Sequence, residues 1–121
     1  MEIREYVMPN GKAPFVEWIN KLRDREARIK IRIRLDRIKS GNPGDCKSLG
    51  HDLYEMRIHY GPGYRVYYGR EGNQLVLLLC GGNKSTQRAD IRLANRYWQD
   101  YRSRSDEKKS IISKKPDSSP C

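Results

Sequence analysis

The stretch from Leu53 to Gly82 restricts the possible folds of this chain more than any other part of the sequence. Leu53 to His59 alternates apolar and charged side chains, and Tyr64 to Gly69 follows it after a Gly-Pro-Gly turn. A run of six apolar residues, Leu75 to Cys80, comes after a second glycine turn. Alternation is typical of a half-buried strand, and a short apolar run of a central strand buried on both faces. Because short glycine turns join antiparallel neighbours, the stretch predicts a three-stranded antiparallel meander.

The residues before the meander predict an edge strand and a short helix. Ile3 to Val7 mixes apolar and polar residues and ends at a Pro-Asn-Gly turn, as an edge strand does. Pro14 suits the first turn of a helix, and apolar residues then recur at i, i+3, i+4 and i+7. These residues are Phe15, Trp18, Ile19 and Leu22. We expect this helix to pack on the sheet.

The segment from Asp24 to Gly41 fits two patterns. Its isoleucines alternate with basic residues over 29–35, as in a strand, but its apolar residues also form a stripe at helical spacing. That stripe is Ala27, Ile31, Leu35 and Ile38. Asp24 is a good N-cap and Gly41 a good stop signal, so we predict a helix.

The chain after the meander predicts a helix and then a tail. Ser85 or Thr86 can cap a helix over residues 87–101, with Arg88, Arg92 and Arg96 recurring along one side. Beyond Arg102 the composition changes to Ser, Lys, Asp and Pro, which cannot build a core. We therefore expect one folded domain over 1–102 and a disordered basic tail over 103–121.

Charge is the compositional feature that bears most on function. The net charge is +10, of which residues 1–102 carry +8. A folded domain this basic attracts polyanions by long-range attraction and counterion release. The composition thus favours nucleic acid or an acidic protein as partner, although a basic surface alone is also found on domains that bind neither.

Several other classes are disfavoured. No apolar run approaches the roughly 20 residues of a membrane-spanning helix, and the first residues carry charges, so we expect a cytoplasmic protein. Cys46, Cys80 and Cys121 are odd in number and widely spaced, which predicts neither a disulfide framework nor a metal site. The chain has no phosphate-binding loop, zinc-protease motif or nucleophile elbow. We expect no cofactor and no metal.

The remaining candidates for chemistry are cations. Arg57 and Arg65 lie on neighbouring predicted strands, and Lys84 comes just after Gly81-Gly82. Three cations on one concave face suit a phosphate. RNA cleavage without a metal needs an activated 2′-hydroxyl, a cation against the charge on phosphorus and a proton for the leaving 5′-oxygen. Arg65 and Lys84 can supply the last two, and His59 or Glu55 can take the 2′-proton. An ordinary ion pair of Glu55 with Arg57 on the strand face is the competing interpretation.

Further residues are candidates for contact with RNA. Tyrosines on the second strand of the meander, Tyr67 among them, can stack on bases, although strands favour aromatic residues in any case. We expect Lys47, His59, Tyr67 and Arg88 to bind RNA around the three cations.

Three ordered blocks of residues also resemble the RelE/ParE toxin superfamily. They are Leu53–Ile58, Gly61–Tyr68 and Leu77–Gln87, followed by Asp90, Ile91 and Ala94. The chain is most similar to the HigB-like branch of addiction-module killer proteins (Gp49-like), over about residues 1–100. The resemblance implies an α+β fold, with N-terminal helices packed on a small curved antiparallel sheet and a C-terminal helix. The order of elements predicted above agrees with that fold.

The resemblance also implies a function. Such a protein is the toxin of a type II toxin-antitoxin module, which cleaves mRNA on the ribosome without a metal and leaves 2′,3′-cyclic phosphate ends. Its partners are the ribosome, mRNA and a small helix-turn-helix antitoxin (HigA-like). Arg65 matches the arginine that stabilises the scissile phosphate, and Lys84 the basic residue that assists the leaving group. Arg57 matches a strand position with a lysine linked to general-base work, a role that a permanently protonated arginine fills poorly.

Two alternatives stay open. A ParE-like inhibitor of DNA gyrase uses the same scaffold without cutting nucleic acid, since fold does not settle function. An inactive nucleic-acid-binding regulatory module is the other. It is favoured by acidic Glu55, which stands where the ribonucleases are often basic, and by the lack of a match to their C-terminal aromatic or histidine residue.

Overall fold

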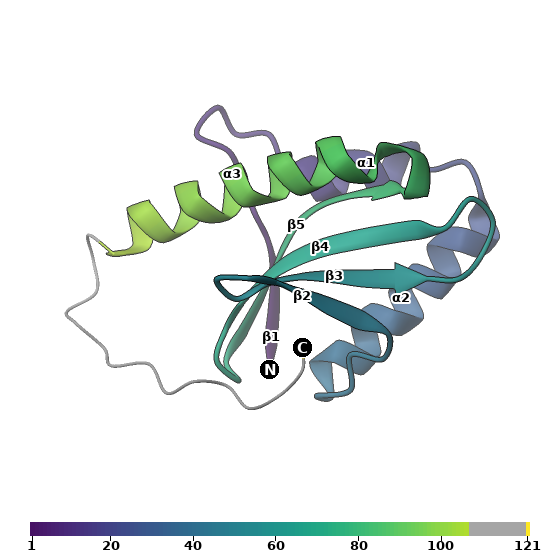
Figure 1. The fold of residues 1–121 in the computed structure, drawn as a ribbon, viewed down its shortest axis with the longest axis horizontal. Coiled ribbons are helices and arrows are strands. Elements are labelled where there is room, and N and C mark those ends of the chain that lie inside the picture. The colour runs from purple at the N-terminus through teal and green to yellow at the C-terminus, as the bar shows by residue number, and fades with distance from the viewer. Residues whose placement is uncertain (107–120) are drawn as a thin grey trace.

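The computed structural model describes residues 1–106 and 121 (Figure 1). The elements follow one another as β1 (Glu2–Glu5), α1 (Pro14–Lys21), α2 (Arg25–Lys39), β2 (Cys46–Gly50), β3 (Leu53–Ile58), β4 (Tyr64–Glu71), β5 (Leu75–Asn83), the 3-10 turn η1 (Lys84–Thr86) and α3 (Gln87–Asp106). The predicted helix at Pro14, the meander and the C-terminal helix are all present. None of the helices in this described part is long and apolar enough to cross a membrane.

The five strands form one sheet in the order β1-β5-β4-β3-β2. The meander β3-β4-β5 is antiparallel, as predicted, but β1 pairs with β5 in parallel. The expected purely antiparallel sheet was therefore wrong, and the sheet is mixed. Parallel neighbours need a long connection, and here every other strand and both N-terminal helices lie between β1 and β5 in the chain.

Helices cover both faces of the sheet (Figure 1). One core cluster joins α1 and α2 to side chains such as Met56 and Val66, and a second joins α3 to Leu53 and Tyr67. The expected helical layer from the N-terminal half is present, and α3 adds a layer on the other face. Because β3 alternates, Glu55 and Arg57 face the α3 side.

Helix α2 settles the ambiguity of the Asp24–Gly41 segment in favour of the helix. The Asp24 carboxylate accepts a hydrogen bond from the Ala27 N–H at 3.1 Å, so Asp24 is the N-cap. The helical stripe is buried, whereas Ile29 and Ile33 of the strand-like pattern are 46% exposed. Burial of the stripe selects the helical period over the alternating one.

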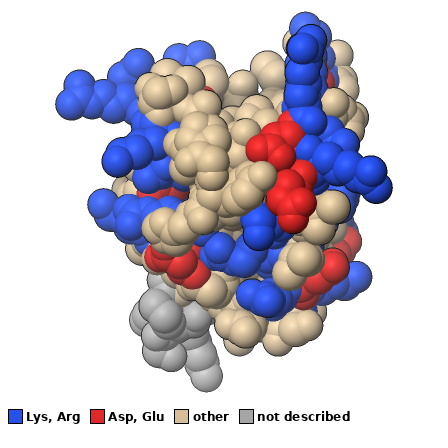
Figure 2. Space-filling view, turned by 90° about the vertical axis from the view of Figure 1, so that its right-hand side faces the viewer, with Lys and Arg blue, Asp and Glu red and all other residues tan. Residues whose placement is uncertain are grey.

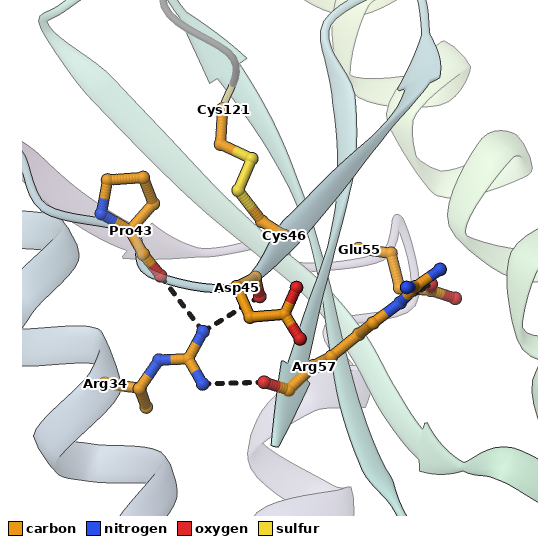
Figure 3. The surroundings of a disulfide bond; sticks show 7 residues. All are labelled: Arg34, Pro43, Asp45, Cys46, Glu55, Arg57 and Cys121. Carbon is orange, nitrogen blue, oxygen red and sulfur yellow. Dashed lines mark hydrogen bonds and ion pairs between the residues drawn. A yellow bond between two sulfur atoms is a disulfide. The ribbon is translucent and has the colours of Figure 1, made fainter. Parts of the chain in front are cut away.

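Strand β2 was missed by the sequence interpretation, which assigned no structure to Cys46–Gly50. This edge strand exposes most of its residues and carries no clear apolar alternation. The Arg34 side chain of α2 holds the segment in place by donating hydrogen bonds to the carbonyl oxygens of Pro43, Asp45 and Arg57 at 3.0, 2.9 and 2.6 Å (Figure 3). The strand thus depends on a contact between distant parts of the chain.

Cys46 and Cys121 form a disulfide, with Cα atoms 6.2 Å apart (Figure 3). The wide sequence spacing of the cysteines was a poor guide here, because residues 75 positions apart lie side by side in the fold. Cys80 is free and buried, and burial raises the pKa of its thiol to about 12.

Helix α3 is longer than predicted. It continues to Asp106, so residues 103–106 are helical and not part of a disordered tail. A 3-10 turn, η1, precedes α3, and Asn83 is its N-cap: the Asn83 side chain accepts a hydrogen bond from the Ser85 N–H at 2.9 Å. The rest of the predicted tail, 107–120, lies outside the described residues.

Candidate nucleic-acid interface

An open groove of about 420 Å³ lies at the end of the β3–β4 hairpin. Residues 57–65 and Lys84 line it, and we call it the cationic groove. The hairpin loop contains Gly61 and Gly63, whose φ values of 57° and 80° suit glycine. Figure 2 views the molecule from the side on which this loop lies in Figure 1; Lys and Arg spread over much of that face, with smaller acidic groups between them.

The groove brings together the three cations singled out in the sequence. Arg57 and Arg65 stand directly opposite each other on β3 and β4, and their side chains are 32% and 13% exposed. Lys84 approaches from η1: a Cβ built on Gly63 would lie 3.3 Å from Arg65 Nη1 and 3.5 Å from Lys84 Cβ. Gly63 therefore leaves the space in which Arg65 and Lys84 converge.

A buried carboxylate lies beneath the two arginines. Glu55 is fully buried, and its oxygens accept hydrogen bonds from Arg57 Nε at 3.0 Å, Tyr67 Oη at 3.0 Å and Gln87 Nε2 at 2.9 Å. Arg65 Nε lies 3.6 Å from the same group, within ion-pair distance. The pair of Glu55 with Arg57 considered from the sequence is thus present, as part of a larger cluster (Figure 3 shows Glu55 and Arg57).

The cluster keeps Glu55 ionised. Burial pushes the pKa of its carboxyl up, but hydrogen bonds from Gln87, Arg57 and Tyr67 outweigh burial and bring the pKa below its usual value. A carboxylate with bound donors, a low pKa and no exposure cannot take a proton from a substrate. The sequence-based suggestion that Glu55 acts as a base is therefore not supported by its surroundings.

Tyr67 does not sit where a base could stack on it. Its side chain is fully buried and donates its hydroxyl to Glu55. Burial and the neighbouring carboxylate raise the pKa of this hydroxyl far above its usual value. This burial does not support the prediction that Tyr67 binds RNA, because α3 covers that part of the face that Tyr67 shares with Arg65.

The other three predicted RNA contacts are exposed but differ in position. Lys47 on β2 stands opposite Glu55 in the register, and β3 lies between it and the strand that carries Arg65. His59 lines the groove, and its Nε2 contacts the Asp45 carboxylate. Arg88 is the second residue of α3, one turn beyond Lys84. The structure places His59 in the groove itself and leaves Lys47 and Arg88 outside its lining.

The start of α3 fixes the position of Lys84. The Thr86 hydroxyl donates a hydrogen bond to the Asp90 carboxylate at 2.5 Å. That carboxylate lies against Gly82, and Gly82 pairs with Arg65 in the register of β4 and β5. A Cβ on Gly82 would come within 1.8 Å of the Asp90 carboxylate. A side chain at position 82 would have to displace the Asp90 and Thr86 side chains, so Gly82 leaves room for the contact between them.

A comparison with known families places the chain. The sequence model described as phage derived protein Gp49-like (DUF891) matches residues 17–99. The chain belongs to the Gp49-like family. This family is RelE-like and toxin-like, in agreement with the resemblance drawn from the three motif blocks. An uncharacterized protein of Haemophilus influenzae is 48% identical over 80 residues, which cover 66% of this chain and 81% of that relative.

The matched region of the Gp49-like chain contains the whole groove and the Glu55 cluster. The groove offers cationic hydrogen-bond donors suited to a phosphate. Tyr60 and Tyr64 line it too, and burial together with the nearby Asp24 carboxylate raises the pKa of both hydroxyls, so they stay protonated at neutral pH. Over residues 1–106 and 121, His, Cys, Asp and Glu form no group of three that could hold a metal ion.

Proposed function

We propose that this Gp49-like protein is the toxin of a type II toxin-antitoxin module and cleaves mRNA on the ribosome through its cationic groove. The observation that carries the proposal is the arginine pair held by buried Glu55 beside Lys84. Two guanidinium groups and an ammonium group around one open groove match the charge of a phosphodiester in its transition state. The overall charge of +10 supports a polyanionic substrate.

The proposed reaction is a transesterification. The 2′-oxygen of the ribose attacks the adjacent phosphorus while the bond from phosphorus to the 5′-oxygen breaks, which gives a 2′,3′-cyclic phosphate and a 5′-hydroxyl. Arg57 and Arg65 stabilise the charge that grows on the non-bridging oxygens. Lys84 donates the proton that the leaving 5′-oxygen requires. No step requires a metal or a cofactor.

The proton of the 2′-hydroxyl needs an acceptor, and His59 is our candidate. Of the residues that line the groove, His59 is the one whose side chain type accepts a proton near neutral pH. Its Nε2 contacts Asp45, which leaves Nδ1 open. A carboxylate on one ring nitrogen orients the imidazole. Arg57 is excluded from this role because its guanidinium remains protonated.

The proposal extends to partners. A protein that cuts mRNA must be silenced in the cell, and we propose a small helix-turn-helix antitoxin of the HigA type. An antitoxin that covers the groove would need acidic or other hydrogen-bond-accepting groups opposite Arg57, Arg65 and Lys84. The ribosome supplies the programmed mRNA strand to the groove.

A second function has one observation in its favour. The His59 side chain is 76% exposed and sits on a loop, which is a loose support for a catalytic base. If it does not act as one, the groove binds a phosphate backbone without cutting it. The protein is then a nucleic-acid-binding module, or a ParE-like gyrase inhibitor in which the same scaffold contacts a protein target.

Expression from a tightly controlled promoter in growing bacteria tests these readings. RNA 5′-ends are mapped within minutes, beside an Arg65→Ala, Lys84→Ala variant and an Arg32→Ala, Lys39→Ala control on the exposed side of α2. New ends inside translated frames that vanish in the groove variant alone support the nuclease. Growth arrest with intact mRNA supports the gyrase reading, and no arrest supports the binding module.

A further inference from the structure

Glu55 combines full burial with contacts to three elements. Arg57 on its own strand, Tyr67 and Arg65 on β4, and Gln87 at the start of α3 all direct N–H or O–H groups at its two oxygens. Arg65 Nε is the farthest of these groups, 3.6 Å from a Glu55 carboxylate oxygen. It forms an ion pair with Glu55 but no hydrogen bond. One carboxylate thus connects the sheet, both groove arginines and α3.

The arginine pair needs such a partner. Arg57 and Arg65 face each other across neighbouring strands, and like charges in this position repel. Both side chains are largely buried, and a buried charge is costly unless it is paired. Glu55 lies beside both and offsets one of the two charges. The groove arginines with Lys84 then retain a net charge of +2 next to Glu55.

The contacts also set the direction of each guanidinium. Arg57 uses Nε toward Glu55, which leaves its two terminal nitrogens at the groove end of the side chain. Arg65 directs Nε toward Glu55 and donates Nη1 to the Gly63 carbonyl at 2.9 Å, which leaves Nη2. Each arginine therefore has one edge fixed inside the protein and at least one donor nitrogen available to a ligand.

We infer that Glu55 is a positioning residue, which holds Arg57 and Arg65 at the separation and orientation in which both bind one phosphate group. That the bound phosphate belongs to mRNA rests on the proposed function. The role of Glu55 in holding the two arginines does not rest on it, because inorganic phosphate can test that role. Acidic Glu55, which the sequence interpretation counted against a nuclease, becomes a requirement for the arginine pair.

The replacement Glu55→Gln keeps the shape of the side chain and removes its charge. The new amide N–H groups point at donors from Arg57, Tyr67 or Gln87, so the arginines lose their fixed orientation. A misplacement of about 1 Å costs roughly 100-fold in rate. We expect single-turnover cleavage of mRNA on purified ribosomes to slow by about 10-fold to 100-fold. The affinity for ribosomes should stay equal or increase, because the groove gains positive charge.

Glu5→Gln is the matched control. Glu5 is an exposed residue of β1 and undergoes the same chemical change with the same gain in net charge. It should leave the cleavage rate within about 2-fold of wild type, by the usual tolerance of surface sites. A rate loss without loss of affinity, in Glu55→Gln alone, is a pattern that general destabilisation does not give. Equal rates for Glu55→Gln and wild type would overturn the inference.

Phosphate binding gives a readout that does not require activity. NMR signals of the Arg57 and Arg65 Nε–H groups are followed in full-length protein during titration with inorganic phosphate. In wild type we expect both signals to move with one midpoint, because one ion contacts both side chains. In Glu55→Gln we expect the two signals to lose their common midpoint, or the phosphate concentration at that midpoint to rise at least several-fold. Two separate midpoints in wild type would contradict the inference.

The two readouts separate the possible failures. A shared midpoint in wild type together with no RNA cleavage would reject the nuclease and keep the role of Glu55. If thermal melting shows that Glu55→Gln does not fold, Gln87→Ala and Tyr67→Phe take its place, since each removes one donor and leaves the carboxylate. Slower cleavage and weaker phosphate binding in these variants support the inference, and wild-type values in both overturn it.

Discussion

The indole of Trp98 lies where a Cβ on Gly69 would stand: that carbon would come within 2.3 Å of the six-membered ring. Gly69 is on β4 and Trp98 on α3, so the missing side chain of one is the space for the other. The indole N–H also donates to the His51 carbonyl at 2.7 Å, in the turn between β2 and β3. Trp98 therefore fixes α3 against both the centre and the edge of the sheet.

Gly69→Ala should destabilise the protein by about 2 to 3 kcal/mol or more, because overpacking of a rigid ring displaces α3. Chemical denaturation measures this directly. Gly81→Ala is the counterpart on the other face, where a Cβ would meet the Trp18 indole of α1, also at 2.3 Å. Both variants should lose stability. A Gly69→Ala variant as stable as wild type would show that α3 does not rest on β4 in solution.

His51→Gly should stabilise the fold. His51 and Asp52 form the two-residue turn between β2 and β3 with φ values of 55° and 65°, a conformation that costs an L residue about 1 to 2 kcal/mol. Part of that gain is offset by the greater freedom of glycine in the unfolded chain, so the expected net gain is about 0.5 to 1 kcal/mol. The carbonyl bonds from Trp98 and Arg102 are unaffected, because they involve the backbone. Ser48→Gly, in the neighbouring strand, should be destabilising instead.

Arg34→Met should loosen the β2 edge. The guanidinium of Arg34 donates to three backbone carbonyls outside α2, and its loss removes a charged donor from each of them. We expect a loss of about 2 to 4 kcal/mol, since hydrogen bonds to charged groups contribute roughly 1.5 to 3 kcal/mol each and methionine retains the packing. Arg32→Met, exposed on the same helix, should change stability by less than about 0.5 kcal/mol. Hydrogen exchange in residues 46–50 should accelerate in the first variant only.

The three cysteines should differ in reactivity. Without reductant, iodoacetamide should label none of them in the folded protein, because Cys46 and Cys121 are joined and Cys80 is buried with a raised thiol pKa. Denaturation alone should add one label, at Cys80, and reduction should add the other two. Mass spectrometry of tryptic peptides assigns the sites. Labelling of Cys46 before reduction would contradict the disulfide.

Glu55 should make stability depend on pH. Its folded-state pKa is below the usual value, so its contribution is fully present above the unfolded-state pKa of about 4.3 and is lost as pH falls through the folded-state pKa. The difference in unfolding free energy between wild type and Glu55→Gln should therefore shrink as pH is lowered from 7 toward 3. A difference that grows on acidification would mean that folding raises the pKa of this carboxyl instead of lowering it.

Local patterns were enough to predict most of the fold. Helix α2 follows from a buried stripe and an aspartate cap, and the meander follows from alternation and glycine turns. Strand β2 and the parallel pairing of β1 do not follow from any local pattern. The first depends on Arg34 from another element, and the second on a partner at the far end of the domain. The same limit applies to the pairing of Cys46 with Cys121.

The sequence was enough to predict the cations of the candidate site, but not the buried residues that hold them in place. Arg57, Arg65 and Lys84 stand out by residue type and place, and the structure brings all three to one groove. Tyr67 and Glu55 were misjudged because a strand pattern shows which face a side chain takes, but not what covers that face. The available signal for the Glu55 cluster was an acidic residue two positions before Arg57, on the same face of an alternating strand.

The most direct test of the account is single-turnover cleavage in a purified system. Ribosomes programmed with a defined mRNA are mixed with wild-type protein, the Arg65→Ala, Lys84→Ala variant or the Arg32→Ala, Lys39→Ala control. The account predicts a cut in the message that carries a 2′,3′-cyclic phosphate and a 5′-hydroxyl, with a rate at least about 100-fold lower in the groove variant. An intact message with wild-type protein, or equal cleavage by the groove variant, would contradict it.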